Sequence, residues 1–131
     1  MRIKVKKPAS LTAVEKRRLS HLHLRNGMMY PSFQDALKWE TPAWVIMAKE
    51  DDGTIEGWAF LEDKTGQRQF DFMIYVRKAR RREGIGTRLL RKARKIAEEW
   101  RKKPLAVTIH DDLSEGFFNN QGPGLKKEYW Y

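Results

Sequence analysis

Two glycines and a group of arginines share one short stretch near the middle of the chain. Residues 81–86, RREGIG, follow an apolar run and precede a segment with helical periodicity. Glycine lets a backbone approach a ligand closely, because it has no Cβ. The first N–H groups of a helix lack intrahelical partners, so a helix N-terminus favours phosphate. Four arginines in the turn and the first helical turn (Arg80, Arg81, Arg82 and Arg88) add positive charge. These residue types at this spacing predict a strand, an anion-binding turn and a helix.

Two common glycine motifs do not fit this turn. A Walker A loop ends in Gly-Lys followed by Ser or Thr, whereas Gly86 is followed by Thr87 and Arg88. A dinucleotide fingerprint has a third glycine, and Leu89 stands at that position. The turn is therefore not expected to bind a nucleotide in either of these ways.

The residues around the glycines resemble the central motif of the GCN5-related N-acetyltransferases (the GNAT superfamily). That motif is Gln/Arg-x-x-Gly-x-Gly/Ala, entered from a strand that ends in Val and followed by Leu-Leu on a helix. The chain has Val76, then Arg81, Gly84 and Gly86 at this spacing, and then two leucines. The resemblance implies that the turn amides hold the pyrophosphate of acetyl-CoA, the co-substrate.

The resemblance also implies a set of cofactor-binding residues. They are Val76, Arg81, Arg82, Glu83, Gly84, Ile85, Gly86, Thr87, Asp111 and Phe118. Asp111 stands where the family has Asn, which weakens one of these expected contacts. No metal is expected: the chain has no cysteine, and His21 and His23 fall on different faces of a predicted helix.

Acetyl transfer to an amine has three chemical requirements. The amine must lose a proton, the thioester carbonyl must be polarised, and the leaving thiolate must be protonated. The resemblance assigns polarisation to the backbone near Ile74 and Val76, where parallel strands separate and admit pantetheine. Asp71 is the candidate general base, with an edge-facing or ion-paired aspartate as the alternative. Glu62 and His110 are further candidates.

The general acid is where the chain departs most from the family. Phe118 stands in place of the Tyr that often protonates the CoA sulfur, and it has no hydroxyl. Tyr129 and Tyr131 are near in sequence only, and water is a further donor. The resemblance therefore implies an N-acetyltransferase, with a catalytically weak or inactive relative that binds a protein partner as the alternative.

The expected acceptor site lies in the N-terminal third of the chain. In the family the first two helices and their link cover the acceptor side of the cleft. On this basis Met28, Met29, Tyr30 and Phe33 are candidates for contacting an amine acceptor, either a small molecule or a protein. The alternative is that these residues belong to the hydrophobic core.

Hydrophobic periodicity, caps and turns predict one mixed α/β domain over residues 1–131. Strands are expected at 2–6, 43–49, 55–61, 69–76, 105–109 and 126–131, and helices at 12–26, 33–40, 84–101 and 113–119. The order β-α-α-β-β-β-α-β-α-β is that of the GNAT-like α/β/α fold with a central mixed sheet. A right-handed crossover makes strand 105–109 parallel to strand 69–76. Only one strand fits after residue 124, so the C-terminus is expected to be trimmed.

The net charge of +10 is concentrated in one segment. Residues 77–103 hold thirteen Lys/Arg and three Glu, while the remaining residues carry fourteen of each sign. A solvated helix face, the CoA phosphates and nucleic acid are the three interpretations left open. No binding motif supports the nucleic-acid interpretation, because Trp100 is the only aromatic residue among the charged residues of this segment.

Composition narrows the remaining classes of protein. No stretch approaches the ~18 apolar residues of a membrane helix, so no membrane partner is expected. The basic N-terminus lacks the apolar region of a secretory signal. The absence of cysteine fits a reducing compartment. A cytoplasmic location is therefore expected.

Overall fold

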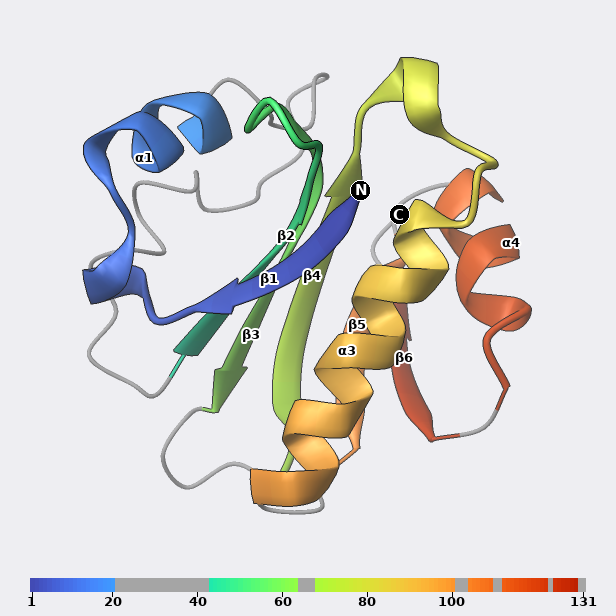
Figure 1. Ribbon diagram of the computed structural model, residues 1–131. Helices are drawn as coiled ribbons and strands as arrows, with labels where there is room; N and C mark the ends of the chain where they lie inside the picture. The colour runs from blue at the N-terminus through green and yellow to red at the C-terminus, as the bar shows by residue number, and fades with distance from the viewer. Residues whose placement is uncertain (21–42, 64–67, 101–103, 110–111, 123, 130–131) are drawn as a thin grey trace.

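The computed structural model describes residues 1–20, 43–63, 68–100, 104–109, 112–122 and 124–129. Six strands form one sheet, with helices on both of its faces (Figure 1). The strands are β1 (Arg2–Lys6), β2 (Ala43–Lys49), β3 (Ile55–Asp63), β4 (Phe70–Val76), β5 (Leu105–Ile109) and β6 (Leu125–Tyr129). The helices are α1 (Ala13–Ser20), α3 (Ile85–Trp100) and α4 (Asp112–Asn119), with short 3₁₀ helices η1 (Pro8–Ser10) and η2 (Lys78–Arg80).

The strands lie in sequence order across the sheet. β1 to β4 are antiparallel neighbours, whereas β4, β5 and β6 are parallel. α3 connects β4 to β5 and α4 connects β5 to β6, as parallel neighbours require a crossover. The predicted mixed sheet and the parallel pairing of the strand after the long helix are thus confirmed.

Two apolar layers form on the two faces of the sheet. One layer joins α3 to alternate strand residues such as Ile46, Leu61 and Phe72, and it includes Phe118 of α4. The other joins the α1 side to the intervening residues, including Val45 and Phe60. β2 contributes to both, which explains why its sequence is apolar without alternation.

A capping box begins α1, as the sequence Thr12-x-x-Glu15 predicts. The Thr12 N–H donates to Glu15 Oε1 at 2.9 Å, and the Glu15 N–H donates to Thr12 Oγ1 at 3.1 Å. Lys6 and Lys49 also contact the Glu15 carboxylate, at 2.7 and 3.1 Å. We call Glu15, Thr12, Lys6 and Lys49 the Glu15 cluster. Burial alone would raise the pKa of Glu15, but hydrogen bonds from Lys6, the Thr12 N–H and Lys49 lower that pKa from 4.5 to about 2.

Several boundaries differ from those predicted. β3 continues to Asp63 and remains buried throughout, because β2 and β4 flank it. The two 3₁₀ helices were not predicted; η2 lies between the end of β4 and the predicted anion-binding turn. Predicted helix 33–40 and the last part of helix 12–26 lie outside the described residues.

Candidate cofactor site

The predicted turn connects the end of β4 to the start of α3. Arg82 and Gly84 both have left-handed backbone conformations, with φ of 67° and 82°. The Arg88 N–H donates to the Gly84 carbonyl at 3.1 Å, which begins the helical hydrogen bonding of α3. Left-handed residues alternating with ordinary ones orient successive N–H groups toward one side, an arrangement that binds anions.

The two glycines are required for different reasons. At Gly84 a Cβ would meet nothing within 4 Å, so the positive φ is the local reason for glycine, and the space beside it is open. At Gly86 a Cβ would lie 3.0 and 3.1 Å from two ring atoms of Phe117. Gly86 therefore allows α4 to pack directly against the first turn of α3.

Arg80 fastens the turn to the sheet. Its guanidinium contacts Glu50 at 3.1 Å, Glu56 at 3.6 Å and Glu83 at 2.9 Å. We call these four residues the Arg80 cluster. Hydrogen bonds to Glu83 and Glu50 raise the pKa of Arg80, which therefore stays charged. Because Glu50 follows β2 and Glu56 belongs to β3, these ion pairs hold η2 and the turn against two strands.

A second arginine holds the end of β4. Arg81 Nε donates to the Val76 carbonyl at 3.0 Å, and its guanidinium carbon lies 5.8 Å from the centroid of the Tyr75 ring. Arg82 and Arg88 are exposed. The sequence grouped four arginines as positive charge for phosphate, but Arg80 and Arg81 also shape the turn.

β4 and β5 separate before β4 ends. Phe70 to Phe72 pair with Leu105 to Val107, and β4 then continues to Val76. The half-buried Ile74 and Val76 thus follow the paired section. This leaves the β4 backbone beside the turn beyond its pairing with β5, where the resemblance implies that the thioester and pantetheine lie.

Asp71 lies in the paired part of β4, not in the part beyond it. It is half-buried, opposite Ala106 of β5 and Glu62 of β3. Gln69 Nε2 donates to Asp71 Oδ1 at 3.5 Å, and Lys126 Nζ donates to Gln69 Oε1 at 3.0 Å. At about 3.3 Å per residue, the Cα of Asp71 is about 10 Å along the strand from that of Ile74. A chain of water molecules would have to connect the carboxylate to an amine beside Ile74.

Two adjacent phenylalanines of α4 differ in burial. Phe118 is buried in the core with 3% of its surface exposed, whereas Phe117 is half-buried against Gly86. The two rings meet edge to face at 5.1 Å between centroids. Gln121 Nε2 donates to Thr87 Oγ1 at 3.4 Å and adds a second link between α4 and α3.

The structure brings the turn and the end of β4, which are close in sequence, together with α4, which follows much later in the chain. Ile85 is buried, so only its backbone can face a ligand; Gly86 and Thr87 are half-buried, and Arg81 to Gly84 are exposed. Sequence reasoning missed Arg80 and Phe117 as residues that position the turn. A signal for Arg80 was its spacing of three from Glu83.

The remaining predicted site residues lie outside the described residues. They are Met28, Met29, Tyr30, Phe33, His110 and Asp111. Within the described ranges, no three His, Asp or Glu side chains are arranged to hold a metal. No helix there is both long and apolar enough to span a membrane.

Comparison with known families identifies the class of protein. Residues 14–122 match the acetyltransferase (GNAT) family model. The chain therefore belongs to the GNAT family, and both the predicted family and the predicted fold class are confirmed. A search of curated proteins found no match.

Solved structures share the fold at low sequence identity. An acyl-CoA N-acyltransferase from Pseudomonas aeruginosa has a TM-score of 0.66 and 23% identity, over 79% of this chain and 75% of that chain. A GNAT acetyltransferase from Staphylococcus aureus has a TM-score of 0.73 and 18% identity, over 92% and 82%. AAC(6')-Iy, in complex with the bisubstrate analogue CoA-S-monomethyl-acetylneamine, has a TM-score of 0.70 and 12% identity, over 100% and 97%.

Proposed function

We propose that this protein transfers an acetyl group from acetyl-CoA to a primary amine of a small molecule or a protein in the cytoplasm. The observation that carries the proposal is the position of the turn. Its left-handed Arg82 and Gly84 lie beside the section of β4 that extends past the pairing with β5. The open space at Gly84 and the exposed Arg82 and Arg88 fit a pyrophosphate.

Acetyl-CoA would supply the activated acyl group as a thioester. The turn would orient the phosphates, while a backbone N–H near Ile74 to Val76 would polarise the thioester carbonyl. The amine nitrogen then forms a bond to the acyl carbon, and the carbon–sulfur bond breaks. The amine loses one proton and the thiolate gains one, so protons balance between amine and CoA.

Proton transfer has fewer candidate residues than cofactor binding. Asp71 is the proposed base and would act through water, since the carboxylate lies back along β4 from Ile74. Phe118 cannot donate a proton to the sulfur, and its ring is buried in the core. We therefore assign protonation of the thiolate to water.

Ligand-induced stabilisation tests cofactor binding. Acetyl-CoA at ~100 times its dissociation constant should add about 2.7 kcal/mol to the free energy of unfolding. Absence of any thermal shift would exclude acetyl-CoA as a ligand. A thiol-release assay with a panel of amines, including aminoglycosides and peptide N-termini, then tests transfer and identifies the acceptor class.

A second candidate function is favoured by the absence of a hydroxyl at Phe118. In this case the protein binds a protein partner and retains CoA as a ligand without efficient transfer. A thermal shift with acetyl-CoA, together with no thiol release for any amine tested, would support this second function over the first.

A further inference from the structure

A groove of about 370 Å³ lies between β1 and the C-terminal half of α3. Its apolar lining comes from Ile3 and Val5 of β1, Trp44 of β2, and Ile96 and Trp100 of α3. At about 1.5 Å per helical residue, Ile96 lies about 15 Å along α3 from Gly86. The groove is therefore separate from the proposed cofactor site.

The apolar lining is only partly covered by the protein itself. Ile3, Val5 and Ile96 are half-buried at the margin of the core between the sheet and α3. Trp100 remains 43% exposed, although it meets Trp44 edge to face at 4.9 Å between ring centroids. Contiguous apolar surface left in water is unfavourable and often marks an interaction site.

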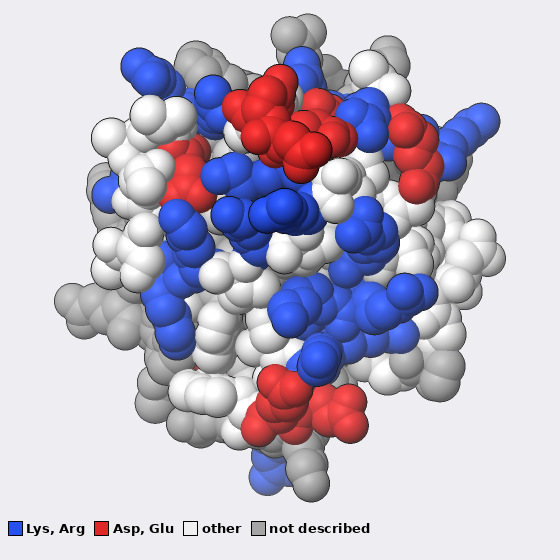
Figure 2. Space-filling model, in the orientation of Figure 1, with Lys and Arg blue, Asp and Glu red and all other residues white. Residues whose placement is uncertain are grey.

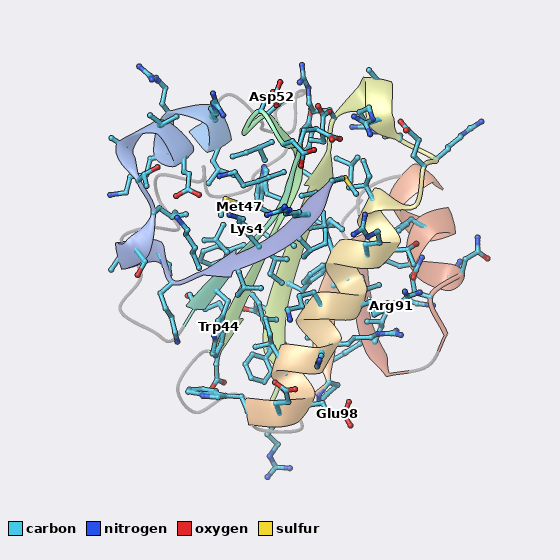
Figure 3. The ribbon with its side chains drawn as sticks, in the orientation of Figure 1. Lys4, Trp44, Met47, Asp52, Arg91 and Glu98 are labelled. Carbon is cyan, nitrogen blue, oxygen red and sulfur yellow. The ribbon has the colours of Figure 1, made fainter. Side chains whose placement is uncertain are left out.

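Positive charges lie on both sides of this groove. Lys7 Nζ lies 4.3 Å from the centroid of the Trp44 ring and 5.9 Å from that of Trp100, and Lys92 lines the groove from α3. Arg91 is exposed on the same helix, and Figure 3 labels it together with Trp44 of the groove. Figure 2 shows Lys and Arg side chains spread over the face where β1 and α3 lie in Figure 1.

Among the described residues that line the groove, negative charge lies at one end only. Glu99 lines it near Trp100, and Glu98 is exposed on the neighbouring position of α3. The apolar floor and the basic sides thus suit a ligand that is itself apolar on one side and acidic on the other. The acidic end favours a basic residue at one end of that ligand.

We propose that the groove is a docking site for an amphipathic acidic segment of a partner protein. Apolar side chains of the segment would pack on Trp44, Ile96 and Trp100, and its carboxylates would approach Lys7 and Lys92. The apolar floor favours a peptide over a nucleic acid, whose sugar–phosphate backbone is polar. The exposure of Trp100 indicates an open groove instead of an enclosed small-molecule pocket.

Two synthetic peptides test the predicted chemistry. One has Leu at positions i, i+3, i+4 and i+7 with Glu at the other positions, and the control has Lys in place of every Glu. Calorimetric titration of the full chain should show at least about tenfold tighter binding of the Glu peptide, because charge complementarity selects the partner. Indole N–H shifts of Trp44 and Trp100 in NMR spectra should follow the same titration.

Matched charge variants locate the binding surface. The double variant Lys7→Glu/Lys92→Glu should weaken binding of the Glu peptide at least about tenfold, and Lys16→Glu on exposed α1 should change it less than about twofold. Circular dichroism and thermal melts establish first that each variant folds. Acetyl-CoA binding should be unchanged in all of them, which keeps this test independent of the proposed function.

Four results would overturn the proposal. Equal binding of both peptides, or unchanged binding by the double variant, would show that charge does not select the ligand there. Binding of an oligothymidylate that the double variant abolishes, with no binding of the Glu peptide, would identify a nucleic-acid surface. A concentration-dependent dimer that Trp100→Ala dissociates would assign the groove to a second copy of the chain.

Discussion

The Glu15 cluster and the Arg80 cluster have opposite charge arrangements, and their central residues differ in burial. In the first, a carboxylate with 5% of its side chain exposed contacts two lysines. In the second, an arginine with 33% of its side chain exposed contacts three carboxylates. Because water screens exposed ion pairs, only the first is expected to contribute strongly to stability. The second holds the proposed cofactor turn against β2 and β3, so its contribution is to the geometry of that turn.

The largest expected effect is on folding stability through Glu15. Because the folded state lowers the pKa of Glu15 from 4.5 to about 2, its contribution is complete above pH 4.5 and disappears as pH falls toward about 2. The shift corresponds to about 3 kcal/mol. Glu15→Gln should lower the free energy of unfolding by a similar amount at neutral pH. Urea unfolding at several pH values measures both effects.

Glu98→Gln is the matched control for Glu15, since Glu98 is exposed on α3. It should leave stability nearly unchanged at every pH, and neither variant should alter acetyl-CoA binding. A Glu15 variant that keeps the acid sensitivity of the native protein would show that another carboxylate is responsible.

A smaller effect is expected on cofactor affinity through the Arg80 cluster. Arg80→Gln should weaken acetyl-CoA binding about tenfold by loosening the turn. Glu50→Gln separates a positioning role of Arg80 from direct phosphate binding by the direction of the change in affinity. It removes a partner of Arg80 but also removes a negative charge near the proposed phosphate site. Weaker binding by Glu50→Gln supports a positioning role, whereas tighter binding would mean that Arg80 contacts phosphate directly. Arg2→Gln is the control, because Arg2 is an exposed residue of β1.

The apolar contact between Gly86 and Phe117 provides a third test. Ala usually stabilises a helix by about 1 kcal/mol relative to Gly, but Gly86→Ala should lose that gain, because the new Cβ would lie 3.0 Å from a ring atom of Phe117. In the double variant with Phe117→Leu, the loss should be partly recovered, and a double-mutant cycle of unfolding free energies measures this coupling. Strict additivity would mean that α4 is not packed against the turn.

The smallest effect is expected at Arg82. Glycine adopts a positive φ without strain, so Arg82→Gly should change stability by only a few tenths of a kcal/mol. The same change should weaken acetyl-CoA binding, since it removes an exposed positive charge beside Gly84. If affinity is unaffected, the backbone of the turn, and not the Arg82 side chain, provides the binding.

Much of the fold follows from local sequence signals. The turn at residues 51–53, the capping box at Thr12 and Glu15, and the periodicity of α3 each have a local physical cause, and the structure contains all three. The positive φ of Gly84 could also be anticipated from its residue type. These features depend on residues only a few positions apart.

The contacts that hold the site in place join residues that are far apart in sequence. Arg80 contacts Glu50, which is thirty positions earlier, and Phe117 contacts Gly86, which is thirty-one positions earlier. No local pattern specifies such pairs, because they arise only when strands and helices pack together. The end of the β4–β5 pairing at Phe72 is likewise a property of two strands joined by a long helix.

Calorimetric titration with acetyl-CoA of the native protein and of Gly84→Val most directly tests whether the turn binds the pyrophosphate. The native protein should bind one equivalent. Val at a φ of 82° would strain the turn and fill its open side, so affinity should fall at least about 100-fold. The absence of binding by the native protein, or equal binding by a folded Gly84→Val variant, would contradict the assignment of this turn as the cofactor site.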